Sequence, residues 1–371
     1  SLVISIGGIF VYLLSEKIIV NKKISLILAL SYLTNFWIHQ QNLFDFHAVT
    51  LATGVLLAAF YFLIKKSYKL FLLSLFIALL TKENVFLVSA VFGIFIYGKQ
   101  NKKLGIGLLI VSLLLFYIIT AFAIPNARGT EHFALSYYLY LGDSFLDILK
   151  NLFVKPQLLF SHLLTTSTIT YFHELLIPTG YIALLSPLYL IFALPDFAIY
   201  LLSSNENLRM HYYHYGALIV PFIYVSTIYG IKFIINKTKY RNTGNMIFYY
   251  LLTALLLTFY LYSPLPGMRE ADYRIFSSQN SDVLKKYLAL IPPDASVSAS
   301  NNIGAHLSQR EKIYVMPYGI NFAEYVVLHG ASKSVVNSID ILQYDSYVSD
   351  PQLNFYIFKK KTSAPCSLCT P

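Results

Sequence analysis

The sequence predicts an α-helical polytopic membrane protein with a small C-terminal α/β domain. Apolar residues make up 56% of its 371 residues and charged residues 12%, compared with roughly 25% charged residues in average soluble domains. The mean hydropathy is +0.58. The charged residues gather between long apolar runs, which is the pattern of loops that join membrane helices.

Apolar runs, about nine in number, fill residues 1–263, and several approach the roughly 20 residues needed to cross the hydrocarbon core. Each run is predicted to be a helix, because lipid cannot satisfy an open backbone. The runs cover approximately 2–15, 24–38, 47–64, 68–81, 84–98, 104–124, 176–194, 214–235 and 246–263. No charged residues precede the first run, so it does not resemble a signal peptide. We expect a further N-terminal segment before Ser1.

Lysine and arginine are divided unevenly between alternate loops. The richer set holds Lys17, Lys22, Lys23, Lys65, Lys66, Lys69, Lys99, Lys102, Lys103, Lys232, Lys237, Lys239 and Arg241, and the poorer set holds Lys82, Arg128, Lys150, Lys155 and Arg209. The positive-inside rule predicts that the richer set is cytoplasmic. Ser1 and the C-terminal domain are then expected outside the plasma membrane. This distribution accounts for the net charge of +10 without a nucleic-acid partner.

One apolar stretch, residues 173–204, is interrupted by Pro178, Pro187 and Pro195. The loops on both sides of it must be outside, so we predict one span followed by a return segment at about 195–204, or a re-entrant hairpin. Non-helical backbone at that depth must be buried in protein or line a cavity. Residues 136–166 mix apolar and charged positions, which favours amphipathic helices in the outer interface.

The character of the chain changes at about residue 264, which divides it into a transmembrane domain, 1–263, and a soluble domain, 264–371. In the second domain we predict helices at 281–291 and 302–307, and strands at 296–300, 313–316, 325–328 and 355–358. Cys366 and Cys369 form a C-x-x-C pair in the tail. This pair supplies two of the four ligands of a zinc site, so an incidental tail, a disulfide and a metal role all stay open.

Titratable side chains gather in the loops predicted to be outside. The candidates for a site are Asp45, His47, Lys82, Glu83, Arg209, His211 and His214. Each group also has a simpler interpretation. Asp45 and His47 are placed to cap the next helix, and Lys82 with Glu83 to form a solvated turn. His211 and His214, at i and i+3, are placed to anchor one helix face, or to supply a metal pair that needs more ligands.

Several short strings resemble one known family. They are Phe44-Asp45-Phe46-His47, Thr81-Lys82-Glu83-Asn84, Leu194-Pro195-Asp196, Leu202-Ser203-Ser204-Asn205, His211-Tyr212-Tyr213-His214-Tyr215 and Ala305-His306-Leu307-Ser308-Gln309-Arg310. Their order and spacing resemble the predicted membrane proteins of domain-of-unknown-function family 2079. The resemblance covers residues from about 30 to 360.

That family resembles the C-type, multispanning glycosyltransferases, which take a sugar from a polyprenyl-phosphate carrier at the outer membrane face. The resemblance implies an inverting transfer, with the lipid-linked sugar and membrane lipids as partners and no required cofactor, although a divalent metal stays open. Such chemistry needs a carboxylate to accept the acceptor's proton, and cationic groups to hold the phosphate.

The candidate residues fit these two roles. Asp45, Glu83 and His47 are predicted to be catalytic, whereas Lys82, Arg209, His211 and His214 are predicted to bind the lipid phosphate. The alternatives are a non-catalytic envelope or scaffolding protein, and a transporter. A transporter is expected to show polar residues in mid-membrane or paired broken helices in two repeats, and the sequence has one broken region and no repeat.

Overall fold

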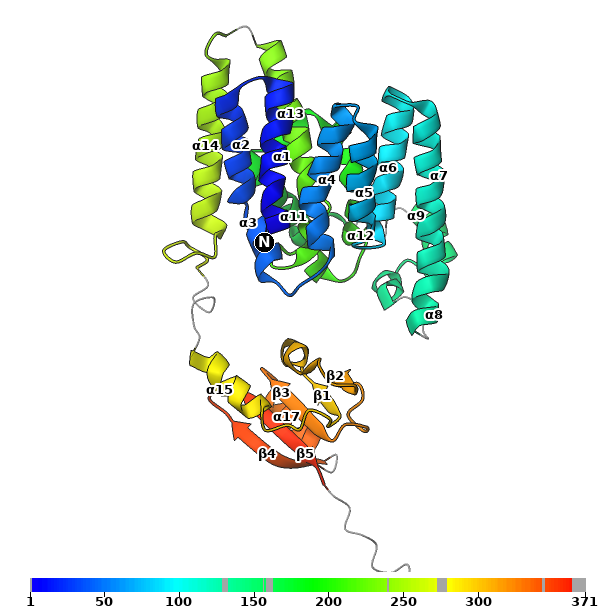
Figure 1. The fold of residues 1–371 in the computed structure, drawn as a ribbon, viewed down its shortest axis with the longest axis vertical. Coiled ribbons are helices and arrows are strands. Elements are labelled where there is room, and N and C mark those ends of the chain that lie inside the picture. Colours follow the sequence, from blue (N-terminus) through cyan, green and yellow to red (C-terminus); the bar gives the residue numbers. More distant parts are fainter. Residues whose placement is uncertain are drawn as a thin grey trace, which may run out of the picture. The chain divides into compact units, whose positions relative to one another are not determined.

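The computed structural model describes residues 2–128, 133–155, 157, 163–238, 240–271, 279–341 and 344–361. It divides the chain into two units, Ser1–Asp272, a helical bundle, and Tyr273–Pro371, a small α/β unit (Figure 1). The sequence placed this boundary at residue 263, where the last apolar run ends. The bundle continues beyond that point because the chain folds back on its last helix, where Arg269 N donates to Tyr260 O at 3.0 Å.

The bundle contains helices of very different lengths. They are α1 (Leu2–Ile19), α2 (Lys22–Leu33), α3 (Phe36–Leu43), α4 (Val49–Ile64), α5 (Tyr68–Leu79), α6 (Asn84–Lys99), α7 (Lys102–Ile118), α8 (Ile124–Arg128), α9 (Phe145–Val154), α11 (Thr166–Leu176), α12 (Leu194–Leu201), α13 (Val220–Lys237) and α14 (Thr243–Tyr262). A π-helical turn, Ile119–Ala123, joins α7 to α8. The amphipathic stretch expected at 136–166 contains α9, but residues 156 and 158–162 lie outside the described part of the chain.

Among the described residues, three helices are long and apolar enough to cross a membrane by themselves. They are Leu2–Ile19, the continuous helix Lys102–Ala127, and Thr243–Tyr262. Four shorter apolar helices accompany them, at Val49–Ile64, Tyr68–Leu79, Asn84–Lys99 and Pro187–Leu201. A membrane protein with helical spans is therefore supported, whereas the count of about nine spans stays a prediction.

Alternate turns of the bundle lie at opposite ends. The turns between α1 and α2, α4 and α5, α6 and α7, and α13 and α14 all lie at the top of the bundle in Figure 1. These turns carry the richer set of lysine and arginine residues, so we call this the Lys-rich end. The opposite end, which holds α3, α8 and the C-terminal end of α14, is called the site end below.

Helix α13 is the centre of the bundle. Its residues from Val220 to Ile228 are buried without interruption, which a helix achieves only when other elements surround it. Three phenylalanines form part of this core. Phe192 lies with its ring centroid 5.1 Å from that of Phe222 and 4.6 Å from that of Phe92. The centre of the bundle therefore consists of packed aromatic and aliphatic side chains.

Residues 166–201 form a broken hairpin against α13, called the hairpin below. The first arm is α11, which ends in a 3-10 turn, Ile177–Thr179. The chain then turns through Gly180 and Tyr181, both at φ +58°. It returns through two further 3-10 segments, Ile182–Leu185 and Pro187–Ala193, and through α12. Three of these segments contain a proline near their start. Proline cannot donate the hydrogen bond that continues a helix, so regular α-helix is interrupted at these positions.

The hairpin's open backbone is satisfied inside the protein. The Ser226 hydroxyl of α13 is 2.7 Å from both Ala183 O and Ser186 O. A Cβ added at Gly230 would overlap Ile182 O, so glycine allows the close approach of α13 to the turn. This arrangement is the one that membrane proteins require of non-helical backbone.

Helices α6 and α7 approach each other through small residues. The Ser112 hydroxyl donates to the Ser89 hydroxyl at 2.8 Å. A Cβ added at Gly105 would overlap the backbone of Tyr97 and Gly93. Small residues at a helix contact allow the close backbone packing that associates helices in membranes.

We expect Gly105→Leu to separate α6 from α7 and to destabilise the bundle by about 1–3 kcal/mol, as overpacking does. The measurement is the Tm of the detergent-solubilised protein. Gly107→Leu is the matched control, because nothing lies within 4 Å of a Cβ added at Gly107. Equal Tm values for the two variants would contradict the predicted contact.

The second unit is a five-stranded sheet with the strand order β2-β1-β3-β5-β4. Its strands are β1 (Val297–Ala299), β2 (Ile313–Val315), β3 (Tyr325–His329), β4 (Tyr344–Asp350) and β5 (Phe355–Lys360). Strand β1 pairs in parallel with β2 and β3, and β5 pairs antiparallel with β3 and β4. Helix α15 (Gln279–Leu288) packs on one face and α17 (Lys333–Ile341) on the other. The sequence did not predict α17 or β4.

Candidate functional site

Two histidines from distant parts of the chain stack at the site end. The rings of His47 and His214 have centroids 3.7 Å apart and planes 15° apart. His47 follows α3, whereas His214 lies in a 3-10 turn, His214–Gly216, just before α13. Phe44 stacks beside both imidazoles, at 5.3 Å and 5.8 Å. His214 is 6% exposed, and its Nδ1 is buried without a hydrogen-bond partner.

The loop that carries His47 is shaped by its own hydrogen bonds. His47 Nδ1 lies 2.8 Å from the carbonyl oxygen of Asp45, and the Asp45 side chain is exposed. The N-cap of α4 is Ala48, and no side chain makes a capping hydrogen bond there. The simpler interpretation of Asp45 and His47 as helix caps is therefore wrong.

A buried carboxylate lies beside the turn between α5 and α6. Asp196, at the start of α12, is fully buried, and Asn84 Nδ2 lies 3.3 Å from its Oδ1. Lys82 and Glu83 are close enough for their charges to act on Asp196, and the Tyr200 hydroxyl also approaches the carboxylate. Asp196 Oδ2 has no partner that meets hydrogen-bond geometry. In the sequence, Asp196 belongs to one of the strings that resemble the family, Leu194-Pro195-Asp196, but it was not among the predicted site residues.

Lys82 is a charged neighbour of both the carboxylate and the histidine pair. Its charge acts on Asp196 and on His214. The side chains of Lys82 and Glu83 are half-buried, so they are not fully solvated as an ordinary turn would be. We call Asp196, Asn84, Lys82, His47 and His214 the central cluster.

The pKa of His214 is lowered to about 3, chiefly by burial in this cluster and, to a smaller extent, by the neighbouring His47 and Lys82. Burial disfavours the charged imidazolium, and nearby cations add repulsion. His214 is therefore neutral at pH 7 in the folded protein. An anion bound beside it would offset the repulsion and favour its protonation.

We expect His214 to contribute a loss of stability to the bundle as the pH falls below about 6.5. The folded pKa of His214 is lowered, so the unfolded chain binds more protons between about pH 3 and 6.5, and stability rises with pH in that window by at most about 1.4 kcal/mol per pH unit. The measurement is Tm between pH 5 and 7.5. His214→Phe should flatten this dependence, whereas the control His306→Phe, at an exposed position, should not. Identical profiles for His214→Phe and the unmodified chain would contradict the assignment.

Arg209 is buried at the site end, with 3% exposure, and binds the protein's own backbone. Its Nη1 donates to Tyr200 O and to Ser203 O, both at 3.0 Å. Its Nε donates to the Ser167 hydroxyl at 3.3 Å. Arg209 Nη2 is 3.7 Å from the exposed carboxylate of Glu206. Arg209 therefore ties the C-terminal end of α12 to the start of α11, and its guanidinium does not join the central cluster.

His211 lies between two carboxylates that the sequence analysis did not select. Its Nδ1 is 2.9 Å from Glu174 Oε2, and its Nε2 is 3.6 Å from Glu270 Oε2. Phe36 and Trp37 contact the imidazole edge to face. His211 Nε2 and Glu270 Oε2 are both buried without a hydrogen-bond partner. In the sequence, Glu174 could have been noticed only by its place at the start of the interrupted stretch 173–204. Glu270 follows Pro264 and Pro266, just after the end of α14.

The expectation that His211 and His214 share one helix face is wrong. Residues 210–213 are not helical, and a short 3-10 turn begins only at His214. His211 points to Glu174 and Glu270, whereas His214 points to His47. Among the described residues, no group of three or more His, Cys, Asp and Glu side chains is arranged to hold a metal ion. Glu131, His132, Cys366 and Cys369 lie outside the described residues.

Unpaired polar atoms concentrate at the site end. In the described part of the chain, six buried side-chain atoms lack a hydrogen-bond partner: Gln41 Nε2, Tyr171 Oη, Asp196 Oδ2, His211 Nε2, His214 Nδ1 and Glu270 Oε2. Gln41 belongs to α3, His211 and His214 precede α13, and Glu270 follows α14, so four of the six residues belong to segments at this end. Buried polar groups are almost always paired, so these atoms are candidates for contact with a ligand.

The family model described as "Predicted membrane protein (DUF2079)" matches residues 1–354. The chain belongs to this family of predicted membrane proteins. The match covers the bundle and the C-terminal unit as far as the end of β4, and it stops before β5. No curated protein and no solved structure gives a significant match to the chain.

Proposed function

We propose that this family member is a membrane glycosyltransferase that moves a sugar from a polyprenyl-phosphate-linked donor to an acceptor at the site end. The observation that carries the proposal is the central cluster, where the charge of one half-buried lysine acts both on a buried carboxylate with an unpaired oxygen and on one of two stacked imidazoles. A transfer site needs both a proton acceptor and groups that bind phosphate.

In this mechanism the acceptor hydroxyl attacks the anomeric carbon of the donor sugar. The bond between that carbon and the phosphate oxygen breaks, the phosphate keeps the electron pair, and the configuration at carbon inverts. Asp196 takes the proton of the attacking hydroxyl. Glu83 and Asp45, with His47, are the further candidates for this role, because they lie in the two loops that adjoin the cluster.

Lys82, His47 and His214 are the proposed phosphate ligands. Lysine is a point charge that suits phosphate, and the two imidazoles supply ring N–H donors. Binding of the anion favours protonation of His214, whose pKa is lowered in the empty cluster, so the affinity for lipid phosphate should rise as the pH falls. His211 lies apart with its two carboxylates and is proposed to bind the acceptor rather than the phosphate.

Radiolabelled undecaprenyl phosphate tests this function without knowledge of the sugar. The chain in nanodiscs should bind it saturably, and Lys82→Ala should weaken binding at least about tenfold, the value of one charge-assisted contact. Undecaprenyl-phosphate hexoses then test transfer, with release of undecaprenyl phosphate as the readout. Absence of both binding and release would leave the envelope-protein alternative.

The proposal also places the site end outside the cell, with about nine spans and with the C-terminal unit on the same side, since α14 ends there. We expect Asn42→Cys to react with an impermeant thiol reagent added to intact cells, and Lys102→Cys not to react. Both variants need Cys366 and Cys369 replaced by serine. Reaction at position 102 but not at 42 would invert the topology.

A further inference from the structure

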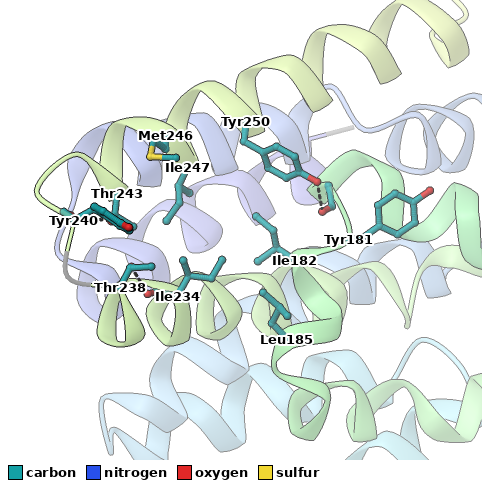
Figure 2. Close-up of a pocket in the computed structure, with 11 residues that line it drawn as sticks. Tyr181, Ile182, Leu185, Ile234, Thr238, Tyr240, Thr243, Met246, Ile247 and Tyr250 are labelled. Carbon is teal, nitrogen blue, oxygen red and sulfur yellow. Dashed lines mark hydrogen bonds between the residues drawn. The ribbon is translucent and has the colours of Figure 1, made fainter.

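An apolar groove lies between α13 and α14 on the side of the Lys-rich end. It has a volume of about 660 Å³, within the range of about 300–1,000 Å³ that is usual for ligand sites. Figure 2 shows the side chains that line it, from α14, α13 and the turn of the hairpin. The apolar lining includes Ile182, Leu185, Ile234, Met246 and Ile247.

The groove exists because the hairpin turns back before it reaches the Lys-rich end. The Tyr250 hydroxyl donates to Gly180 O at 2.9 Å and closes the inner end of the groove at the hairpin's turn. The groove continues from Tyr250 to Thr243, the first residue of α14. These eight residues of helix cover about 10 Å, a large part of one hydrocarbon leaflet, which is about half of 30 Å thick.

The groove is open along its length. Met246 is 66% exposed and Tyr250 is 52% exposed, although both line it. They belong to α14, one of the three helices able to span a membrane. The medium that reaches them is therefore lipid, and a hydrocarbon chain can enter sideways. A peptide is a poor occupant, because the apolar lining leaves its backbone groups unsatisfied.

The mouth of the groove is cationic. Lys237 and Arg241 are exposed beside Thr238 and Tyr240, which line the mouth. The turn between α1 and α2 adds Lys22 and Lys23, since a Cβ at Gly244 would lie 3.2 Å from the Asn21 side chain. Glu16 is the nearest carboxylate of that turn, and it accepts a hydrogen bond from Ser25 at 3.4 Å. Basic residues at this depth favour anionic lipid headgroups.

We propose that this groove binds one acyl chain of an anionic phospholipid, whose headgroup phosphate rests among the basic residues of the two turns. The apolar lining, the lateral opening and the cationic mouth each match one part of that molecule. This site lies at the end opposite the central cluster and does not depend on sugar transfer.

Photo-crosslinking in vesicles of phosphatidylcholine and phosphatidylglycerol at 4:1 tests the site. p-Benzoylphenylalanine replaces Met246 in the groove or, as a control, Ile106 of α7. Ile106 is 46% exposed, lies near Lys102 and Lys103 at the same end, and does not line the groove. We expect the ratio of captured phosphatidylglycerol to captured phosphatidylcholine at 246 to exceed that ratio at 106 at least about fivefold, the effect of one basic residue near the surface.

Two further variants separate the chain site from the headgroup site. Lys237→Gln with Arg241→Gln should remove the enrichment, and Leu185→Trp, which fills the groove, should lower total lipid capture at position 246. The same phosphatidylglycerol fraction at 246 and 106 would overturn the proposal. So would capture of another copy of the chain at 246, because protein would then cover the groove.

Discussion

Asp196→Asn should lower the rate of sugar transfer by about 10²–10⁴-fold, the usual contribution of a general base. Asparagine has the shape of aspartate and keeps an oxygen for Asn84, which lies 3.3 Å from Asp196 Oδ1. It cannot accept the proton of an acceptor hydroxyl. Asp196→Asn should therefore bind undecaprenyl phosphate normally and keep its Tm. The initial rate of transfer from an undecaprenyl-phosphate hexose should fall.

Glu83→Gln is the matched control for this experiment. Glu83 precedes Asn84, and its replacement by glutamine removes one negative charge, as Asp196→Asn does. Unlike Asp196, Glu83 is half-buried, and Asn84 donates its hydrogen bond to Asp196. The transfer rate of Glu83→Gln should stay within about tenfold of that of the unmodified chain, because the Glu83 carboxylate influences the reaction only by its electrostatic field. A large loss in Glu83→Gln with a small loss in Asp196→Asn would make Glu83 the base, as the sequence predicted.

The membrane class and the grouping of the basic turns at one end of the bundle could be predicted from sequence because the bilayer imposes strong constraints. Long apolar runs must be helices in lipid, and alternate turns that carry Lys17, Lys65 and Lys99 lie at one end of the bundle. The prolines at 178, 187 and 195 also predicted where regular helix would fail. The helix lengths were less predictable, since a run such as 68–81 forms only a 12-residue helix.

The pairing of side chains across the bundle could not be predicted. A single sequence shows which residues lie at one end, but not which helices are neighbours there. His47 meets His214, Asn84 meets Asp196, and Glu174 meets His211, each across more than one intervening element. Hydrophobic periodicity contains no information about such contacts.

The spacing of two histidines gave one wrong prediction. His211 and His214 are three residues apart, which predicts a shared face only if the segment is helical. The segment instead turns, so the two imidazoles enter different clusters. Glu174 and Glu270 were missed for a related reason, because spacing along the chain does not indicate that either carboxylate approaches His211.

Arg209→Ala should destabilise the bundle by about 3–5 kcal/mol, the usual cost of breaking a buried charged network. The guanidinium donates to Tyr200 O, Ser203 O and the Ser167 hydroxyl. Its removal takes away the donor that both carbonyl oxygens share and releases the end of α12 from the start of α11. The measurement is the Tm of the detergent-solubilised chain, together with protease cleavage near residue 203.

Two controls separate this positioning role from direct contact with the donor. Arg209→Lys keeps the charge but lacks the planar fork that reaches three acceptors, so it should recover only part of the Tm. Arg241→Ala removes an exposed arginine at the Lys-rich end and should change stability by less than about 0.5 kcal/mol. A normal Tm for Arg209→Ala with loss of undecaprenyl phosphate binding would instead make the guanidinium a phosphate ligand. Since all three of its partners belong to the hairpin or the segment that follows it, the first outcome is the one the contacts favour.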